Sequence, residues 1–248
     1  MSDTIKDMGL RGVYQEVWLK TAANNLANVN TAGFMRELAA FRIPEDSKTD
    51  KETPELTFRN FTPTSTTTYT IFSTGAIQLT GNTFDLALDG PGFFCIETPN
   101  GVEYTRNGTF AINSDRELVT QEGFRVLGEG GPISIQAEAG HVLIGEHGDI
   151  SVDGEMGDRL SIRSFSDNRL LKRTSETRYI PIDDENVTPD TPERTGVVQG
   201  ALEMSNVNVV REMTDLIEIH RGYESYQKII RSMDECSSKV INEMGVLR

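Results

Sequence analysis

The strongest constraint in this 248-residue sequence is an apolar repeat in residues 202–248. Twelve positions from 209 to 247 alternate in steps of three and four residues, and only Glu212 and Ser237 among them are neither apolar nor aromatic. The ten that fit are Val209, Leu216, Ile219, Tyr223, Tyr226, Ile230, Met233, Val240, Met244 and Leu247. The spacing predicts one helix of about 40 residues, ~60 Å long. Such a helix cannot cover its own apolar side, so other helices must pack against it.

Polar residues mark where this helix begins. Ser205, Asn206 and Asn208 are candidate N-caps, because their side chains can accept hydrogen bonds from the free N–H groups of a first turn. Glu212 and Asp215 follow in the early turns, where negative charge is favourable. Since Glu212 and Ser237 interrupt the apolar pattern, we expect them to make polar contacts between subunits.

Residues 3–30 carry a second helical pattern. Its apolar stripe, again in steps of three and four, contains Ile5, Met8, Leu19, Ala22, Leu26 and Val29. Additional apolar residues widen this face, which favours contact with more than one neighbour. The helix is expected to end in the asparagine-rich run 24–30, with Gly33 completing the stop.

The residues between the helices change character twice. Residues 34–75 contain three prolines and a threonine-rich stretch, which predicts a linker with one or two β segments and a disordered part at 45–55. From about 76 to 195, short apolar runs alternate with Gly, Asn and Pro turn signals, which predicts a β meander. Further strands are expected at 133–136, 141–145, 149–153, 159–165 and 169–173, and a return strand at 196–202.

The predicted fold class is therefore α+β, with paired terminal helices and a mostly antiparallel β domain. Residues 1–33 and 203–248 would form a terminal coiled-coil domain. Residues 34–75 and 196–202 would connect it to a β domain at 76–195. The two helices are expected to cover part of each other's apolar faces.

Charge and composition exclude several kinds of partner. Asp and Glu number 38 against 24 Lys and Arg, a net charge of −14, which argues against nucleic acid and anionic membranes. No apolar run is long enough for a transmembrane helix, and no cleaved signal peptide is recognised at the N-terminus. Those two features alone predict a cytoplasmic chain but are compatible with export that uses no cleaved signal. Cys95 and Cys236 are far apart and fit neither a disulfide framework nor a zinc site.

The sequence offers little for catalysis. His141, His147 and His220 lack a zinc-like spacing, and no nucleophile, nucleotide or metalloprotease motif is present. Asp85 and Asp89 could act as a carboxylate pair in a glycan hydrolase, but an Asp beside a Gly is more often part of a turn. We therefore expect no enzyme activity, no metal and no cofactor.

Three motifs resemble one known family. ANNLANVNTAGFMRE (23–37) resembles the N-terminal signature of the bacterial flagellar rod and hook proteins. GNTFDLALDGPGFFCIETPNGVEYTRNGTF (81–110) is similar to their central block. VQGALEMSNVNVVREMTDLIEIHRGYESYQKII (198–230) is similar to their C-terminal block. The three occur in the family's order and span most of the chain.

The resemblance implies a structural subunit of a tubular axial assembly. In that family the terminal helices pair as a coiled coil and pack with those of neighbouring subunits, and the β domain forms an outer layer. The resemblance also implies localisation in the flagellar basal body, export through the flagellar apparatus without a cleaved signal, and partners that are copies of the chain and other rod proteins. The stretch RIPEDSKTDKE after Phe41 favours the proximal part of the rod, whereas GPGFF is closer to the distal part.

The interface residues expected from the two helices are Leu19, Leu26, Val29, Leu216, Ile219, Tyr223, Ile230 and Met233. The alternative functions are a distal rod or hook-type axial protein, a soluble adaptor that binds one partner coiled coil, and a glycan hydrolase of the β domain.

Overall fold

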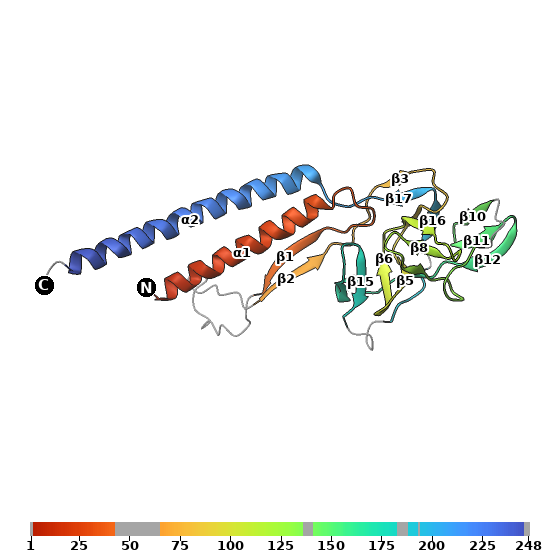
Figure 1. The fold of residues 1–248 in the computed structure, drawn as a ribbon, viewed down its shortest axis with the longest axis horizontal. Coiled ribbons are helices and arrows are strands. Elements are labelled where there is room, and N and C mark those ends of the chain that lie inside the picture. The colour runs from red at the N-terminus through yellow and green to blue at the C-terminus, as the bar shows by residue number, and fades with distance from the viewer. Residues whose placement is uncertain (1, 43–64, 136–140, 183–187, 193, 246–248) are drawn as a thin grey trace, which may run out of the picture. The chain divides into compact units, whose positions relative to one another are not determined.

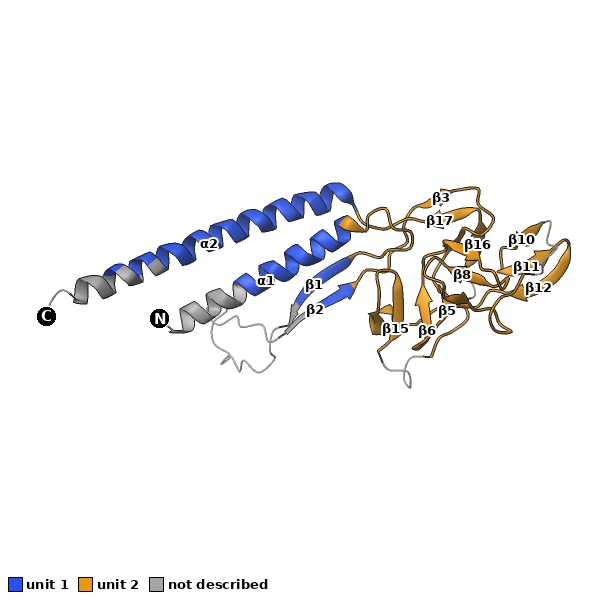
Figure 2. Cartoon of the chain, viewed as in Figure 1, with its two compact units in different colours: residues 1–26, 37–69, 208–248 blue, residues 27–36, 70–207 orange. Residues whose placement is uncertain are grey.

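A computed structural model describes residues 2–42, 65–135, 141–182, 188–192 and 194–245. The chain divides into two compact units, which Figure 2 shows in different colours. Unit 1 contains Met1–Leu26, Glu37–Tyr69 and Asn208–Arg248, and unit 2 contains Ala27–Arg36 and Thr70–Val207. The expected linker residues 45–55 lie outside the described part.

Unit 1 is built on the two long helices that the sequence predicts. Helix α1 spans Ser2–Ala27 and helix α2 spans Val209–Gly245, and they run side by side in opposite directions (Figure 1). Strands β1 (Glu37–Arg42) and β2 (Ser65–Thr70) form a two-stranded sheet. The expectation of one or two β segments in the linker is therefore confirmed.

The ends of the helices follow from local polar chemistry. Asn208 is the N-cap of α2, because its Oδ1 accepts a hydrogen bond from the Arg211 N–H at 3.1 Å. After α1, the Thr31 N–H donates to the Asn28 carbonyl at 3.1 Å. Gly33 then adopts a φ of 68°, a left-handed conformation that glycine reaches without the usual side-chain clash.

Unit 2 contains one large sheet in which neighbouring strands run antiparallel. Its strand order is β14-β15-β6-β5-β9-β8-β7, and β13 pairs with β5. The strands are β5 (Phe93–Thr98), β6 (Gly101–Thr105), β7 (Phe110–Ile112), β8 (Leu118–Thr120), β9 (Arg125–Val126), β13 (Ile162–Arg163), β14 (Leu171–Arg173) and β15 (Arg178–Pro181). A short 3₁₀ helix, η2 (Asn168–Leu170), precedes β14.

Smaller sheets complete unit 2. Strands β10 (Val142–Ile144), β11 (Asp149–Val152) and β12 (Glu155–Arg159) form a three-stranded antiparallel sheet. Strand β4 (Leu86–Asp89) pairs with β16 (Gly196–Gln199), and β3 (Ile77–Leu79) pairs with β17 (Ala201–Glu203). The return segment at 196–202 is thus two strands, because Gly200 turns the chain with a φ of 73°.

Some strand predictions were wrong in detail. The segment after residue 133 makes only an isolated bridge at Ser134 within the described residues, and β12 and β15 were not predicted. The large sheet is also not a simple meander, because β5 lies between β6 and β9. The strands expected at 141–145 and 149–153 are confirmed by β10 and β11.

Strand β5 separates two apolar cores in unit 2. Phe94 and Ile96 belong to one buried cluster, whereas Phe93 and Cys95 belong to the other. Successive side chains of a strand point to opposite faces, so a strand covered on both faces needs a continuous apolar run. This explains the sequence FFCI at 93–96. The second cluster also contains Met35, Tyr104 and Tyr179.

Candidate assembly interface

Small residues mark where the two helices of unit 1 approach each other. A Cβ atom added at Gly12 would lie 3.1 Å from Cε1 of Tyr226, and one added at Gly222 would lie 3.0 Å from Nε2 of Gln15. Glycine at these positions therefore allows closer contact than a larger residue would. The contacts bring the predicted apolar face of α2 toward α1.

Asn25 connects three elements of unit 1. Its Nδ2 donates to the Glu37 carbonyl at 2.8 Å, and its Oδ1 accepts from the Glu37 N–H at 2.9 Å. The same Nδ2 lies 3.3 Å from Oε2 of Glu212, to which it donates. Both side chains are buried, so these hydrogen bonds satisfy groups that would otherwise be costly inside the protein. Asn25 thus links α1 to β1 and to the first turn of α2.

The structure places Glu212 differently from the sequence expectation. Glu212 is 2 % exposed and hydrogen-bonded within its own chain, so the structure gives it an internal role and not the expected contact between subunits. A buried polar residue at a core position is a known way to fix the register of paired helices at some cost in stability. The side chain of Ser237 lies outside the described part.

The predicted interface residues fall into two groups. Leu19 and Leu26 on α1, Val29, and the α2 residues Leu216, Ile219 and Tyr223 are partly buried. Ile230 and Met233 are 37 % and 43 % exposed and lie further along the same heptad face of α2. Val29 belongs to unit 2, so the structure does not gather all eight residues in one unit.

Sequence reasoning missed a second apolar stripe on α2. Val210, Met213 and Ile217 are 75 %, 49 % and 53 % exposed, and their steps of three and four residues place them on one side of the helix. Trp18 and Val13 of α1 are exposed as well. The sequence contains a second series of apolar residues at steps of three and four, which starts at residue 210. It was not recognised, because the series that starts at residue 209 is longer.

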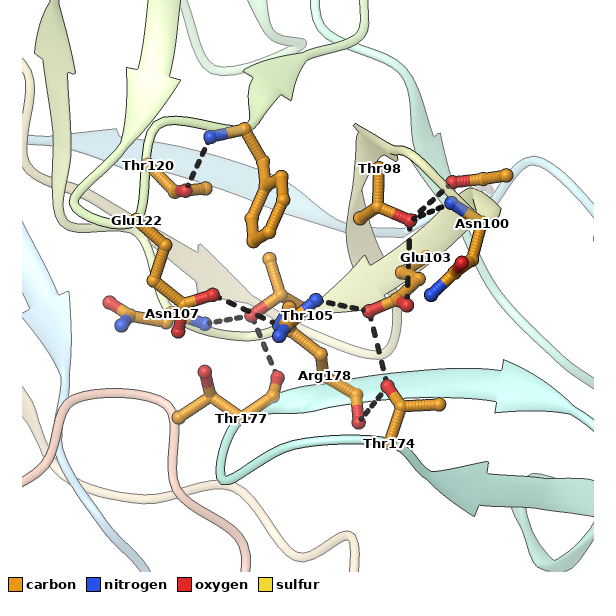
Figure 3. Close-up of polar contacts among 12 residues, drawn as sticks. Thr98, Asn100, Glu103, Thr105, Asn107, Thr120, Glu122, Thr174, Thr177 and Arg178 are labelled. Atoms are coloured by element: carbon orange, nitrogen blue, oxygen red, sulfur yellow. Dashed lines mark hydrogen bonds and ion pairs between the residues drawn. The ribbon is translucent and has the colours of Figure 1, made fainter.

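A polar cluster in unit 2 is centred on the buried side chains of Glu103 and Thr105 (Figure 3). Oε2 of Glu103 accepts hydrogen bonds from Nη1 of Arg178 at 2.8 Å and from Oγ1 of Thr174 at 3.1 Å. Nε of Arg178 lies 3.2 Å from Oε2 of Glu122, an ion pair without hydrogen-bond alignment. In the same cluster, Oγ1 of Thr105 donates to the Thr177 carbonyl at 2.8 Å. The cluster joins β6 to β15 and the turn before it.

The residues considered for catalysis have structural or surface positions. Asp85 is buried, and its Oδ2 accepts hydrogen bonds from Thr80 and Asn82 at 2.7 and 2.9 Å, as expected for turn chemistry. Asp89 is exposed. Burial raises the pKa of the Cys95 thiol, although a hydrogen bond from Ser161 opposes this effect.

Neither a metal cluster nor a membrane span is found in the described residues. No three His, Cys, Asp or Glu side chains gather there as metal ligands. Neither of the described long helices is apolar enough to cross a membrane.

The fold and these surfaces define a class of protein. A β unit is combined with a long helix pair, and that helix pair leaves large apolar side chains exposed in stripes. Exposed apolar stripes of this kind are typical of surfaces that bind other proteins. The class is that of α+β proteins in which a β unit is joined to a long helix pair with exposed apolar stripes.

Comparison with known proteins assigns the family. Residues 198–243 match the family described as "Flagellar basal body rod FlgEFG protein C-terminal", residues 87–152 match "Flagellar hook protein FlgE/F/G D1 domain", and residues 15–34 match "Flagella basal body rod protein". These ranges overlap each of the three motifs recognised in the sequence.

Full-length relatives agree with these matches. The flagellar basal-body rod protein FlgF of Caulobacter vibrioides is 35% identical, over 92% of this chain and 91% of the relative. FlgF of Mesorhizobium japonicum is 32% identical over 92% and 91%. FlgG of Bacillus subtilis, also named a flagellar basal-body rod protein, is 34% identical over 90% and 92%. The chain belongs to the flagellar basal-body rod family, which is a family of structural proteins and not of enzymes.

Proposed function

We propose that this chain is a subunit of the axial rod, in its proximal part, and that it assembles with copies of itself and with other rod proteins through its terminal helices. The observation that carries the proposal is the apolar surface left exposed on α2, at Val210, Met213 and Ile217 and again at Ile230 and Met233. Membership of the rod family supplies the kind of assembly that would cover this surface.

The proposed assembling domain consists of residues 1–33 and 203–248. Its helices would pair as a coiled coil along the face that includes Leu216, Ile219 and Tyr223, with Leu19, Leu26 and Val29 on the N-terminal side. Contacts at Gly12 and Gly222 support this pairing. Neighbouring subunits would then cover Ile230 and Met233 and the stripe formed by Val210, Met213 and Ile217.

The exposed stripe would supply part of the free energy of association. Fully burying one large aliphatic side chain contributes about 1.5–3 kcal/mol, and the three stripe residues begin about half to three-quarters exposed. Burying them would therefore contribute roughly 3–6 kcal/mol per subunit before the entropy of association is subtracted. Repeated contacts that do not close a ring produce a filament.

The same proposal includes export and mechanical function. The subunit would leave the cytoplasm through the flagellar export apparatus, and the assembled rod would transmit torque and enclose the export channel. Rigid packing between helices is the physical basis of torque transmission, because closely packed interiors have low compressibility.

The proposal is tested by introducing a charged side chain into the stripe formed by Val210, Met213 and Ile217. Ile217→Glu, in a strain whose own copy of the gene is deleted, should prevent swimming and rod assembly, because a carboxylate cannot be buried without a partner. Ser225→Glu is the matched control, since it adds the same charge at an exposed position that lies eight residues further along α2 and about 80° around the helix axis. Swimming and imaged basal bodies are the measurements.

Two outcomes would contradict the proposal. Normal rods with Ile217→Glu would show that the stripe is not an assembly surface. Normal rods in the gene deletion itself would show that the chain is not a rod subunit, and would favour the adaptor.

A further inference from the structure

The three signature motifs meet in a polar joint within unit 2, which has a buried ion pair at its centre. The chain passes between the units at four places, after residues 26, 36, 69 and 207. Segments 33–36, 71–76 and 203–206, which lie next to three of these places, are hydrogen-bonded to one another. We define the joint as these segments together with Arg106.

Glu203 is the charged centre of the joint. Its side chain is fully buried, and Oε2 accepts a hydrogen bond from Nη1 of Arg106 at 2.9 Å. Its Oε1 accepts from the Gly75 N–H at 2.9 Å, and its backbone carbonyl accepts from the Gly33 N–H at 2.7 Å. Arg106 also donates to the Gly90 carbonyl at 2.8 Å. Glu203 therefore contacts parts of all three motifs, because its side chain pairs with Arg106 and its backbone carbonyl accepts from Gly33.

Asn206 closes the joint on the side nearest the unit boundary. Its Oδ1 accepts from the Arg36 N–H at 2.7 Å. Its Nδ2 donates to the carbonyls of Ile71 and Ser73 at 2.8 and 2.9 Å. The Ile71 N–H in turn donates to the Arg36 carbonyl at 2.8 Å. The carboxamide thus bonds like a peptide group to the two segments that continue β1 and β2 next to their paired residues.

The joint leaves no room for a side chain at Gly33 or Gly75, where one backbone segment packs directly against another. A Cβ atom added at Gly33 would lie 2.2 Å from the Asn107 backbone nitrogen, and one added at Gly75 would lie 1.8 Å from the Met204 carbonyl oxygen. Contacts this short cannot be relieved by moving a flexible side chain, because the atoms belong to the backbone. Segment 33–36 therefore lies at backbone contact distance from residues 106–107, and segment 71–76 lies at backbone contact distance from segment 203–206.

We propose that Asn206 is a positioning residue for assembly: its carboxamide clamps residue 36 and residues 71–73 to the segment that leads into α2. The points at which β1, β2 and α2 continue from unit 2 are then fixed together. Asn206 touches no partner in this role and acts through the segments that it holds. This inference rests on the proposed rod function, because only assembly into a rod would require β1, β2 and α2 to continue from unit 2 at fixed points.

The matched control is Gln199, whose side-chain amide makes the same kinds of bond elsewhere in unit 2. Its Oε1 accepts from the Ile144 N–H at 3.2 Å, and its Nε2 donates to the carbonyls of Thr83 and Val142 at 3.0 and 3.1 Å. Gln199 therefore also ties three segments, but none of them lies next to a passage between the units. Gln199→Ala removes a similar set of hydrogen bonds without touching the joint.

Hydrogen exchange on the purified full-length chain tests the clamp. Asn206→Ala should speed exchange of the Arg36 and Ile71 amides by about tenfold or more, while the Ile96 amide of the core strand β5 stays protected. Gln199→Ala should speed exchange at Ile144 and leave Arg36 unchanged. Unchanged exchange at Arg36 in Asn206→Ala would overturn the clamp.

Swimming separates positioning from stability. In the gene-deleted strain, Asn206→Ala should fail to restore swimming and Gln199→Ala should restore it, even where both lower the melting temperature equally. Equal defects that follow the melting temperatures, or normal swimming with Asn206→Ala, would overturn the positioning role. Normal swimming of the deleted strain itself would refute the proposed rod function. The hydrogen-exchange result for the Asn206 clamp would still stand.

A second variant covers the case in which Asn206→Ala unfolds unit 2. Asn206→Asp keeps the acceptor for the Arg36 N–H but places a carboxylate oxygen against the carbonyls of Ile71 and Ser73. It should speed exchange at Ile71 more than at Arg36 and reduce swimming. Swimming equal to that of the wild type would overturn the proposal.

Discussion

Removing the charge of Glu203 should destabilise unit 2 strongly. Glu203→Gln preserves the shape of the side chain and one acceptor oxygen, but it leaves the Arg106 guanidinium buried without a counter-charge. The Arg106 side chain is only 8 % exposed, and the 2.9 Å contact is the ion pair that the structure gives it. Breaking a buried ion pair by removing one partner costs about 3–5 kcal/mol.

The magnitude is measurable because it is a large part of a domain's stability. Since Glu203→Gln keeps one hydrogen bond, we expect a loss of about 3 kcal/mol out of a typical 5–15 kcal/mol. For a unit of roughly 150 residues, the melting temperature should fall by about 6–12 °C. Urea unfolding followed by near-ultraviolet circular dichroism reports on the packed rings of Tyr104 and Tyr179.

An exposed ion pair provides the comparison. Glu97 and Arg125 lie 2.8 Å apart, but their side chains are 40 % and 45 % exposed. Glu97→Gln should therefore cost at most about 1 kcal/mol. Equal losses for Glu203→Gln and Glu97→Gln would refute the reasoning. A double variant, Arg106→Met with Glu203→Gln, should lose less than the sum of the single losses, because no unpaired charge remains buried.

Three further predictions concern single side chains. Gly33→Ala should destabilise unit 2 far more than Gly123→Ala, because both glycines have a positive φ but an added Cβ at Gly123 meets nothing within 4 Å; thermal unfolding of the two variants decides this. Cys236 is exposed and should react with a maleimide in the native protein. Cys95 is buried and its raised pKa also disfavours the thiolate, so it should react only after unfolding. Mass spectrometry of the labelled protein counts the maleimides bound. The hydrogen bond from Arg159 holds the pKa of Asp149 below its usual range. The pair therefore stabilises the fold above the ordinary carboxyl pKa, and this stabilisation is lost as the pH falls through the lowered pKa. The difference in unfolding free energy between Asp149→Asn and the wild type should accordingly vanish in acid.

Periodicity predicted the helices well, since both are long and amphipathic. The pattern from Val209 onward predicted α2 almost to its observed bounds, because a three-four repeat sustained over this length matches the period of a helix and not that of a strand. The strands were harder, because β12 (Glu155–Arg159) is exposed along most of its length and has no apolar alternation to reveal it. Pairing of β5 with β9 joins residues that the turn signals between them did not connect.

Buried polar residues were the main omission. Asn25 was interpreted as part of a helix-ending run, yet it lies inside α1 and links α1 to β1 and α2. Asn206 was a candidate N-cap, but Asn208 is the cap and Asn206 belongs to the joint. Sequence cannot distinguish these uses of asparagine, because cap and tertiary clamp require the same carboxamide. Only the partners, at residues 37 and 36, tell them apart.

The joint also determines when the subunit can finish folding. Arg36 and Asn206, which bond to each other, are 170 residues apart in the chain. Contacts between such distant residues form slowly, because the loop between them must first be closed. A chain that is threaded end-first through a narrow passage cannot complete the joint until nearly all of it has emerged. On the proposed export route, the joint would therefore form only after residues 36 and 206 have both left the passage.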